Sequence, residues 1–195
     1  AMEGSIFIAG AGVQWLRDRM KFFKKASETE KLVKSLKDNN NIYLVPAFTG
    51  LGAPHWDAKA RGVLTGITRD TSPKEIVRAT IEAVAYQTYD LFEAMKHDGL
   101  RPKIVKVDGG MVMNNWFSQF LSDIVNVKVL RPRVQETTAV GAAFMAGLQI
   151  GVYKSLKDIS QIWHLDRKFS PGMSSKSRNQ LLKGWSAAIK KTLTN

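Results

Sequence analysis

Apolar runs that favour β-strands alternate along this chain with stretches of helical periodicity. The strand-like runs lie at residues 5–9, 42–45, 62–67, 103–107 and 127–130. The helical stretches lie at about residues 13–20, 28–37, 73–95, 114–124, 138–147 and 176–192. Strands separated by helices are typical of domains in which helices cover a sheet. The order of elements therefore predicts an α/β fold with a largely central sheet.

Two of the predicted helices have recognisable starts. Ser72 is a good N-cap, and Pro73 after it suits the first helical turn. Thr137 and Thr138 are expected to cap a helix of small residues that runs to Gly147. The last predicted helix carries its apolar residues on one side, so we expect it to pack back on the body of the domain.

The composition excludes several classes of site. The 195 residues suit one domain, and the absence of cysteine excludes disulfides, thiolate metal sites and a cysteine nucleophile. No apolar run approaches the roughly 20 residues that span a bilayer, so we expect no membrane partner. The start of the chain does not have the pattern of a secretory signal. We therefore expect a cytoplasmic protein.

The net charge of +12 raises the question of a polyanionic partner. The lysines and arginines are scattered, however, and Lys24–Lys25 and Lys190–Lys191 are the adjacent lysine pairs. No block of like charges and no aromatic-interleaved basic motif occurs. We interpret the charge as solvated surface that attracts anionic ligands in general, and we expect no nucleic acid partner.

The first candidate site is the glycine turn Gly10-Ala11-Gly12, which follows an apolar run and precedes a predicted helix. At such a junction the first backbone N–H groups of the helix are unpaired, and glycine lets an anionic ligand approach them. The dinucleotide fingerprint is incomplete, because Trp15 stands where its third glycine belongs. The sequence also contains no Walker-type phosphate loop. Taken alone, a turn of this kind is more often structural than a ligand site.

The second candidate site has the same arrangement. Gly109 and Gly110 follow the apolar run at 103–107, and Asn114 is placed to cap the next helix. A tight turn with a capping residue again explains the pattern without a ligand. Two such junctions in one chain favour a shared nucleotide site.

Several segments resemble the C-terminal half of the FGGY carbohydrate kinases. Residues 62–67 and 75–82 match each defined position of the family's second signature, and residues 107–110, 114–115 and 136–143 are also similar. Within the family, residues 7–18 and 46–57 are similar to the glycerol kinases in particular. The resemblance runs from about residue 3 to about residue 190.

The resemblance implies an actin-like ATPase (ribonuclease H-like) domain with a mixed central sheet flanked by helices, spanning residues 1–195. It implies ATP or ADP with Mg²⁺ as cofactor and glycerol as phosphoryl acceptor. By position, Gly10 and Gln14 would lie beside the phosphates and sugar of the nucleotide, Gly110 would offer its backbone, and Asn114 would hydrogen-bond nearby. The small-residue helix would pack closely behind the site, although ordinary core packing also explains its small residues and is the interpretation that we prefer.

The resemblance also implies that the catalytic aspartate and the polyol-binding groups belong to an N-terminal domain that this sequence lacks. We therefore name no catalytic residue: Asp108 is expected to orient its turn, and Asp57 has no evident role as a base. His55, His97 and His164 do not have metal-ligand spacing, so no metal site is expected. We expect an inactive domain that can self-associate through apolar surface. Another FGGY kinase, acting on a pentulose or hexonate, and a basic non-enzymatic binding module stay open as alternatives.

Overall fold

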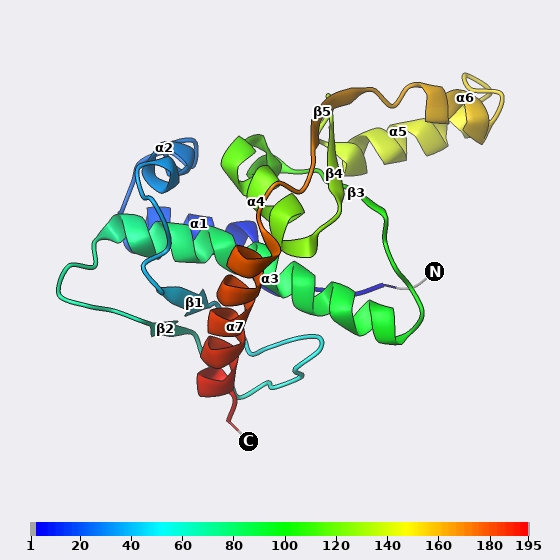
Figure 1. The fold of residues 1–195 in the computed structure, drawn as a ribbon. Coiled ribbons are helices and arrows are strands. Elements are labelled where there is room, and N and C mark those ends of the chain that lie inside the picture. Colours follow the sequence, from blue (N-terminus) through cyan, green and yellow to red (C-terminus); the bar gives the residue numbers. More distant parts are fainter. Residues whose placement is uncertain (1–2, 195) are drawn as a thin grey trace.

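The computed structural model describes residues 3–194. In chain order its elements are α1 (Gly10–Asp18), α2 (Glu28–Lys34), β1 (Tyr43–Val45), β2 (Val63–Thr65), α3 (Pro73–His97), β3 (Ile104–Lys106), the 3-10 helix η1 (Gly110–Met113), α4 (Asn115–Val125), β4 (Lys128–Pro132), α5 (Thr137–Gln149), α6 (Leu156–Gln161), β5 (Leu165–Phe169) and α7 (Ser175–Thr192). Figure 1 shows the long helix α3 crossing the body of the molecule, with α1, α4 and α7 around it.

Helix α3 begins as predicted. Ser72 accepts a hydrogen bond from the Lys74 backbone N–H, and the Glu75 carboxylate accepts one from the Ser72 N–H. Together they make a complete capping box, with Pro73 in the first turn. Buried residues run almost without interruption from Glu75 to Tyr86. The helix contacts α1, α2, α4 and β1, so it is the element against which the site-bearing segments pack.

The strands form two ladders. β1 and β2 pair antiparallel, while β3 pairs parallel to β4 and β4 pairs antiparallel to β5. The α/β class and the mixed sheet are therefore confirmed, with the strands divided between a two-stranded and a three-stranded ladder. Sequence patterns did not reveal β5 because four of its five residues are exposed and three are charged.

An aromatic cluster joins the C-terminal helix to the body. The Trp185 ring of α7 stacks on Tyr86 of α3 with centroids 5.3 Å apart, and Phe120 of α4 meets Tyr86 edge-on at 5.6 Å. Trp185 and Tyr86 are each 1% exposed. Burial of aromatic rings is a major contribution to core stability, so the prediction that the last helix packs back on the body is confirmed.

The prediction of a strand at residues 5–9 is wrong. This segment pairs with no strand, and α1 begins at Gly10 rather than at residue 13. The segment instead lies along α3, where the Gln87 side chain donates a 3.3 Å hydrogen bond to the Ile8 carbonyl. Ile8 is buried and Ile6 packs against the hydrophobic core, so both apolar side chains are covered without a sheet.

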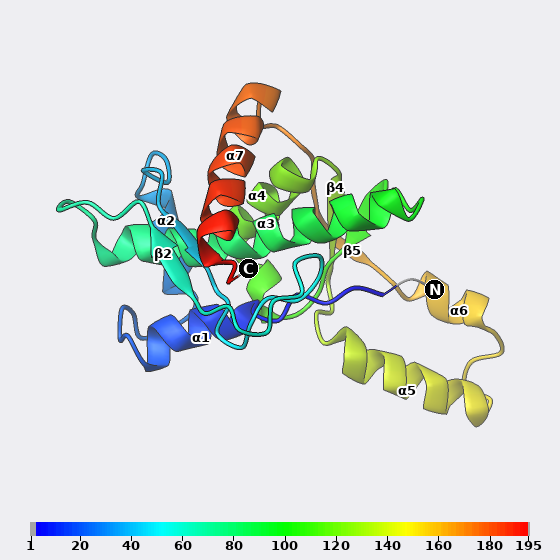
Figure 2. The ribbon, with the colours of Figure 1, turned by 90° about the horizontal axis from the view of Figure 1, so that it is seen from below.

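The small-residue helix packs neither behind the site nor in the core, so both interpretations of it are wrong. Figures 1 and 2 show α5 and α6 projecting together away from the body. Of the residues of α5, Gly147 alone is buried, under the Tyr153 ring. Glu136 rather than a threonine occupies the N-cap position, without a side-chain cap. The local sequence pattern predicted the helix correctly, but it did not indicate which part of the protein the helix packs against.

The long helices do not meet the requirements of a membrane span. Among residues 3–194, no helix combines the length and the apolar character that crossing a bilayer requires.

Candidate functional site

A cavity of about 440 Å³ lies where α1, α2 and the η1–α4 turn converge on α3. This volume is within the range of small-molecule sites in proteins. The four residues singled out from the sequence, Gly10, Gln14, Gly110 and Asn114, all line it. The remaining lining residues are Val13, Arg17, Ala26, Ser27, Thr29, Glu30, Ile81, Met111 and Met113. The structure therefore brings the two glycine junctions together on one cavity.

The first wall is the N-terminal end of α1. Gly10 is the first residue of the helix, and Ala9 before it provides no side-chain cap. The Ala9 carbonyl accepts the Gly12 N–H at 3.0 Å, and no side chain caps the positive end of the helix dipole. Gln14 lies about one turn further along and is exposed. Arg17 follows on the same helix, but its guanidinium is paired with Asp18 at 2.7 Å and holds the pKa of that carboxyl below its ordinary value.

The second wall is the turn that leads from β3 into α4. Gly109 has a positive φ of 82°, which favours glycine, and its N–H donates to the Gln135 carbonyl at 3.1 Å. Gly110 begins η1, and Asn114 caps α4 by accepting the Phe117 N–H at 3.0 Å. The predicted capping role of Asn114 is confirmed, although the short 3-10 helix η1 intervenes between the glycines and α4.

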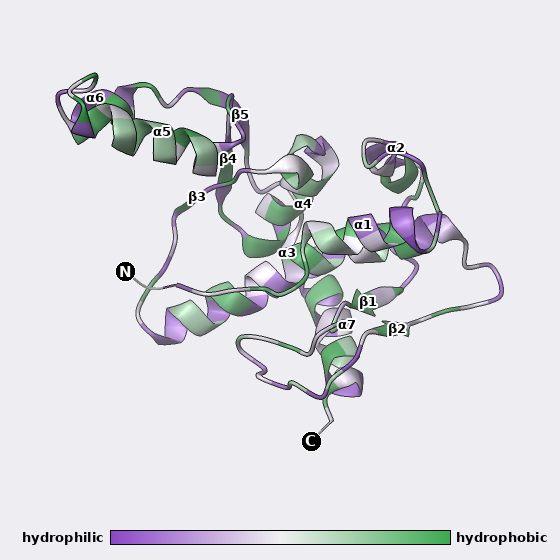
Figure 3. Cartoon of the chain, turned by 180° about the vertical axis from the view of Figure 1, so that it is seen from behind, coloured by the Kyte–Doolittle hydropathy of each residue, from purple (hydrophilic) through white to green (hydrophobic). Residues whose placement is uncertain are grey.

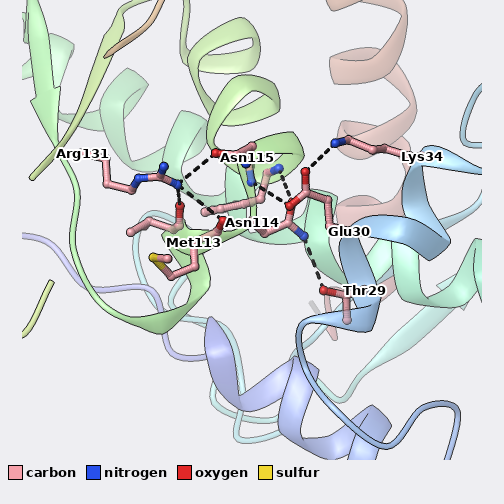
Figure 4. A network of polar contacts seen from close by, with 9 residues as sticks. Thr29, Glu30, Lys34, Met113, Asn114, Asn115 and Arg131 are labelled. Atoms are coloured by element: carbon pink, nitrogen blue, oxygen red, sulfur yellow. Dashed lines mark hydrogen bonds and ion pairs between the residues drawn. The ribbon is translucent and has the colours of Figure 1, made fainter. Parts of the chain in front are cut away.

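The third wall, α2, was not anticipated from the sequence. The Asn114 amide nitrogen donates to the Thr29 hydroxyl at 3.4 Å, and the Asn115 N–H donates to the Glu30 carboxylate at 3.2 Å (Figure 4). Burial raises the pKa of Glu30, but hydrogen bonds from Lys34 and from the Asn115 backbone outweigh it and hold the pKa below its ordinary value. In the sequence, Glu30 and Lys34 have the spacing of an ordinary solvent-exposed ion pair on a helix. That pattern does not indicate that α2 lines a cavity.

The glycines at 10 and 110 are not required by packing within the protein. Apart from its chain neighbours and local helix backbone, a Cβ atom added at either position would meet no atom of the described residues within 4 Å, and neither glycine has a positive φ. By contrast, a Cβ at Gly12 would lie 2.9 Å from the Thr80 side chain, so that glycine serves helix packing. Open space at Gly10 and Gly110, beside a cavity, is the arrangement that lets a ligand reach the backbone.

The carboxylates considered as catalytic substitutes have structural roles or lie in solvent. Asp57 accepts hydrogen bonds from the Lys59 and Ala60 N–H groups and from Thr194, so it ties its loop to the C-terminal end of the described chain. Asp108 is exposed, and the turn that it was expected to orient is held by Gly109 and by contacts from β4.

The histidines do not assemble a metal site. His55 lies 3.3 Å from Asp90, which also accepts the Trp185 indole N–H at 2.7 Å. In the part of the chain that the structure describes, no three acidic or histidine side chains gather in a way that would hold a metal ion.

Comparison with known proteins identifies the family. The model of the C-terminal domain of the FGGY family of carbohydrate kinases matches residues 1–150, more than half of the chain. The chain belongs to the FGGY family of carbohydrate kinases. The resemblance noted in its motifs is thereby confirmed.

FGGY proteins named as glycerol kinases match nearly the whole chain. Glycerol kinase 1 of Pseudomonas aeruginosa is 56% identical over 191 residues, and glycerol kinase of Rhodospirillum centenum is 53% identical over 192 residues. In each case the match covers 98% of this chain and 39% of the relative. The chain therefore spans about two fifths of the length of these curated relatives.

Solved structures of FGGY kinases have the same fold. The crystal structure of Plasmodium falciparum glycerol kinase with ADP matches with a TM-score of 0.87 and 35% identity, over 98% of this chain and 38% of that one. Xylulose kinase from Rhodospirillum rubrum matches with a TM-score of 0.80 at 20% identity, over 96% of this chain and 39% of that one, which is evidence for the fold alone. The actin-like ATPase fold expected from the motifs is the fold of these proteins.

Proposed function

We propose that this chain is the nucleotide-binding half of a glycerol kinase and that its cavity binds the adenine nucleotide. One observation carries the proposal: Gly10, Gln14, Gly110 and Asn114, chosen from separate stretches of sequence, line a single cavity. The match to a glycerol kinase structure that contains ADP supports the same ligand.

The geometry suits a nucleotide in two ways. The uncapped end of α1 favours the negative charge of phosphate groups, and Gly10 and Gly110 allow close approach to the backbone. Asn114 uses its side-chain oxygen to cap α4. Its amide nitrogen has two hydrogens and donates one to Thr29, so the other can donate to a ligand. Gln14 is exposed and adds a second amide to the lining.

For the whole enzyme, we propose transfer of the γ-phosphoryl group of ATP to a hydroxyl of glycerol. Such a transfer requires positioning, stabilisation of charge on the phosphate oxygens, and a carboxylate that accepts the hydroxyl proton. The carboxylate that lines the cavity, Glu30, is engaged by Lys34 and by a backbone N–H. We therefore assign no catalytic residue here, place the proton acceptor and the glycerol-binding groups in a part of the protein outside these 195 residues, and propose that the 195 residues alone are inactive.

The residues present do not fit a magnesium site of their own. Octahedral oxygen coordination by protein ligands usually involves one or two carboxylates that are free to bind, and Glu30 is not. Any Mg²⁺ that accompanies the nucleotide would be held through the phosphates and through groups elsewhere in the protein. The roles assigned above to Gly10, Gln14, Gly110 and Asn114 do not depend on the metal.

We further propose a cytoplasmic protein whose ligands are small molecules rather than nucleic acid or membrane. The net charge of +12 is spread along the sequence, which favours anionic ligands without forming a basic tract. We assign glycerol rather than a pentulose or hexonate because residues 7–18 and 46–57 are similar to glycerol kinases.

Calorimetric titration of the chain with ADP tests the nucleotide site. We expect binding that is weaker than that of a complete kinase, because one face of the ligand stays in water. No heat at millimolar ADP would contradict the proposal. Activity measured on the full-length protein with a panel of polyols, pentuloses and hexonates tests the substrate, and preference for a pentulose or hexonate would contradict the assignment to glycerol.

A further inference from the structure

A buried arginine holds the turn that carries the second glycine junction, although it does not line the cavity. Arg131 lies on β4 and is 6% exposed. One of its terminal nitrogens donates to the carbonyls of Val112 and Met113, at 2.8 and 3.4 Å. The same nitrogen lies 3.1 Å from the Asn115 side-chain oxygen. Figure 4 shows the guanidinium beside this turn, on the opposite side of Asn114 from Thr29.

The other edge of the guanidinium is fixed by the neighbouring strand. The Arg131 Nε and its second terminal nitrogen each lie 2.7 Å from one carboxylate oxygen of Asp166, on β5. The guanidinium also lies over the Phe169 ring, 5.6 Å from its centroid. Because both edges and a face of this planar group are engaged, Arg131 connects the three-stranded sheet rigidly to the turn.

We propose that Arg131 is a positioning residue for the nucleotide cavity: by holding the carbonyls of η1 it fixes Gly110 and Asn114 in the places from which they contact the ligand. This inference rests on the proposed function. Gly110 is the first residue of η1 and Asn114 follows its last, so the two carbonyls that Arg131 binds lie between them. Binding sites gain affinity when the groups around them lock their geometry before the ligand arrives.

The geometry requires arginine rather than a positive charge alone. A lysine ammonium is a single point donor on a flexible stem, and it cannot bridge Asp166 and the turn with a fixed fork. If Arg131 acted through its charge, by attracting phosphate from a distance, lysine at this position would be equivalent. Replacement by lysine therefore separates positioning from simple attraction.

Arg167 provides the matched control. It is the cross-strand partner of Arg131 in the β4–β5 ladder, and its guanidinium lies over the same Phe169 ring at 5.3 Å. It is exposed and lies on β5, at the opposite edge of the three-stranded sheet from β3, which leads into the turn. Arg167→Met removes the same charge from the same sheet, and it leaves the contacts of Arg131 with the turn in place.

The experiment is ADP titration of the full 195-residue chain and its variants at a temperature at which each is folded. We expect Arg131→Met and Arg131→Lys each to weaken ADP binding about tenfold, since charged hydrogen bonds to the turn are lost or rearranged, and Arg167→Met to stay within about twofold of the unmodified chain. Unchanged affinity in Arg131→Met, or full recovery in Arg131→Lys, would overturn the inference.

Amide hydrogen exchange separates this inference from the proposed function. We expect exchange at residues 110–117 to be faster in the Arg131 variants than in Arg167→Met, whether or not ADP binds. Failure of the unmodified chain to bind ADP contradicts the proposed function, whereas unchanged exchange in the turn contradicts the role of Arg131. If Arg131→Met does not fold, Arg131→Lys serves for both measurements with the same two outcomes.

Discussion

The side-chain nitrogen of Asn114 lies 3.4 Å from the hydroxyl oxygen of Thr29, a residue 85 positions earlier in the chain. The same asparagine caps α4 through its side-chain oxygen. One residue therefore begins a helix and joins two walls of the cavity. This combination explains why a residue that looks like an ordinary N-cap in the sequence also belongs to the candidate site.

Replacing Asn114 by alanine should lower both stability and ADP affinity. Loss of the cap costs about 1 kcal/mol of unfolding free energy, and loss of a ligand hydrogen bond costs a similar amount of binding free energy. Ser174→Ala is the control, because Ser174 caps α7 by accepting the Ser177 N–H, away from the cavity. Urea unfolding should show similar losses for both variants, while calorimetry should show weaker ADP binding for Asn114→Ala alone. Equal ADP affinity in the two variants would remove Asn114 from the site.

Adding a methyl group at Gly110 should impair binding without impairing the fold. The space at this Cβ position is open, so the unfolding free energy of Gly110→Ala should lie within about 1 kcal/mol of that of the unmodified chain. A ligand packed against the backbone would meet the methyl group, and ADP affinity should fall. Gly141→Ala, at an equally open position on α5, should leave ADP affinity unchanged. Titration and thermal unfolding of both variants check this, and normal ADP binding by Gly110→Ala would show that the ligand does not approach this backbone.

Asp57 should make stability depend on pH in the acid range. The Thr194 backbone N–H, followed by its hydroxyl and the N–H groups of Ala60 and Lys59, holds the pKa of Asp57 below its ordinary value of 3.8. A depressed folded-state pKa gives a contribution that is present above the unfolded-state pKa and is lost as pH falls through the folded-state pKa. Asp57→Asn should therefore have a lower urea midpoint than the unmodified chain at about pH 7. Its urea midpoint should also decrease less when the pH is lowered to about 3. The exposed Asp70 supplies the control variant Asp70→Asn. An unchanged acid dependence in Asp57→Asn would contradict the role assigned to these hydrogen bonds.

The exposed apolar residues around α5 and α6 should make the isolated chain self-associate. Ile150 is 77% exposed, Val152 65% and Leu156 64%, and Figure 3 shows α5 coloured white to green along most of its length. Contact between such surfaces removes apolar area from water. Sedimentation velocity should show a weight-average mass that rises with concentration and rises less in Ile150→Lys. A concentration-independent monomer would contradict the prediction.

The parts of the fold that depend on local signals were predictable from the sequence. The caps at Ser72 and Asn114 and most of the alternation of strands and helices are set by neighbouring residues, and they are present in the structure. The strand expected at residues 5–9 failed because a strand needs a partner, and the periodicity of one segment does not supply one. The predicted placement of helix α5 was wrong for a related reason. Small residues indicate close packing, but they do not indicate which element packs against them.

The candidate site was half predictable. Its two glycine junctions have a local pattern with a physical meaning, and all four residues chosen from them line one cavity. Thr29 and Glu30 could not be found in this way, because their contribution depends on where α2 is placed against α4. The same holds for Arg131, whose contacts with the turn and with Asp166 join segments that lie 16 to 35 residues away in the sequence.

We propose that the junction before α1 and the junction before α4 form one nucleotide site. The most direct measurement is an ADP titration followed in the backbone amide NMR spectrum of the chain. We expect the Gly10, Gln14, Gly110 and Asn114 signals to shift progressively with a common dissociation constant, while the Gly141 signal from α5 stays unmoved. Shifts confined to one junction, or centred on a different part of the surface, would contradict it.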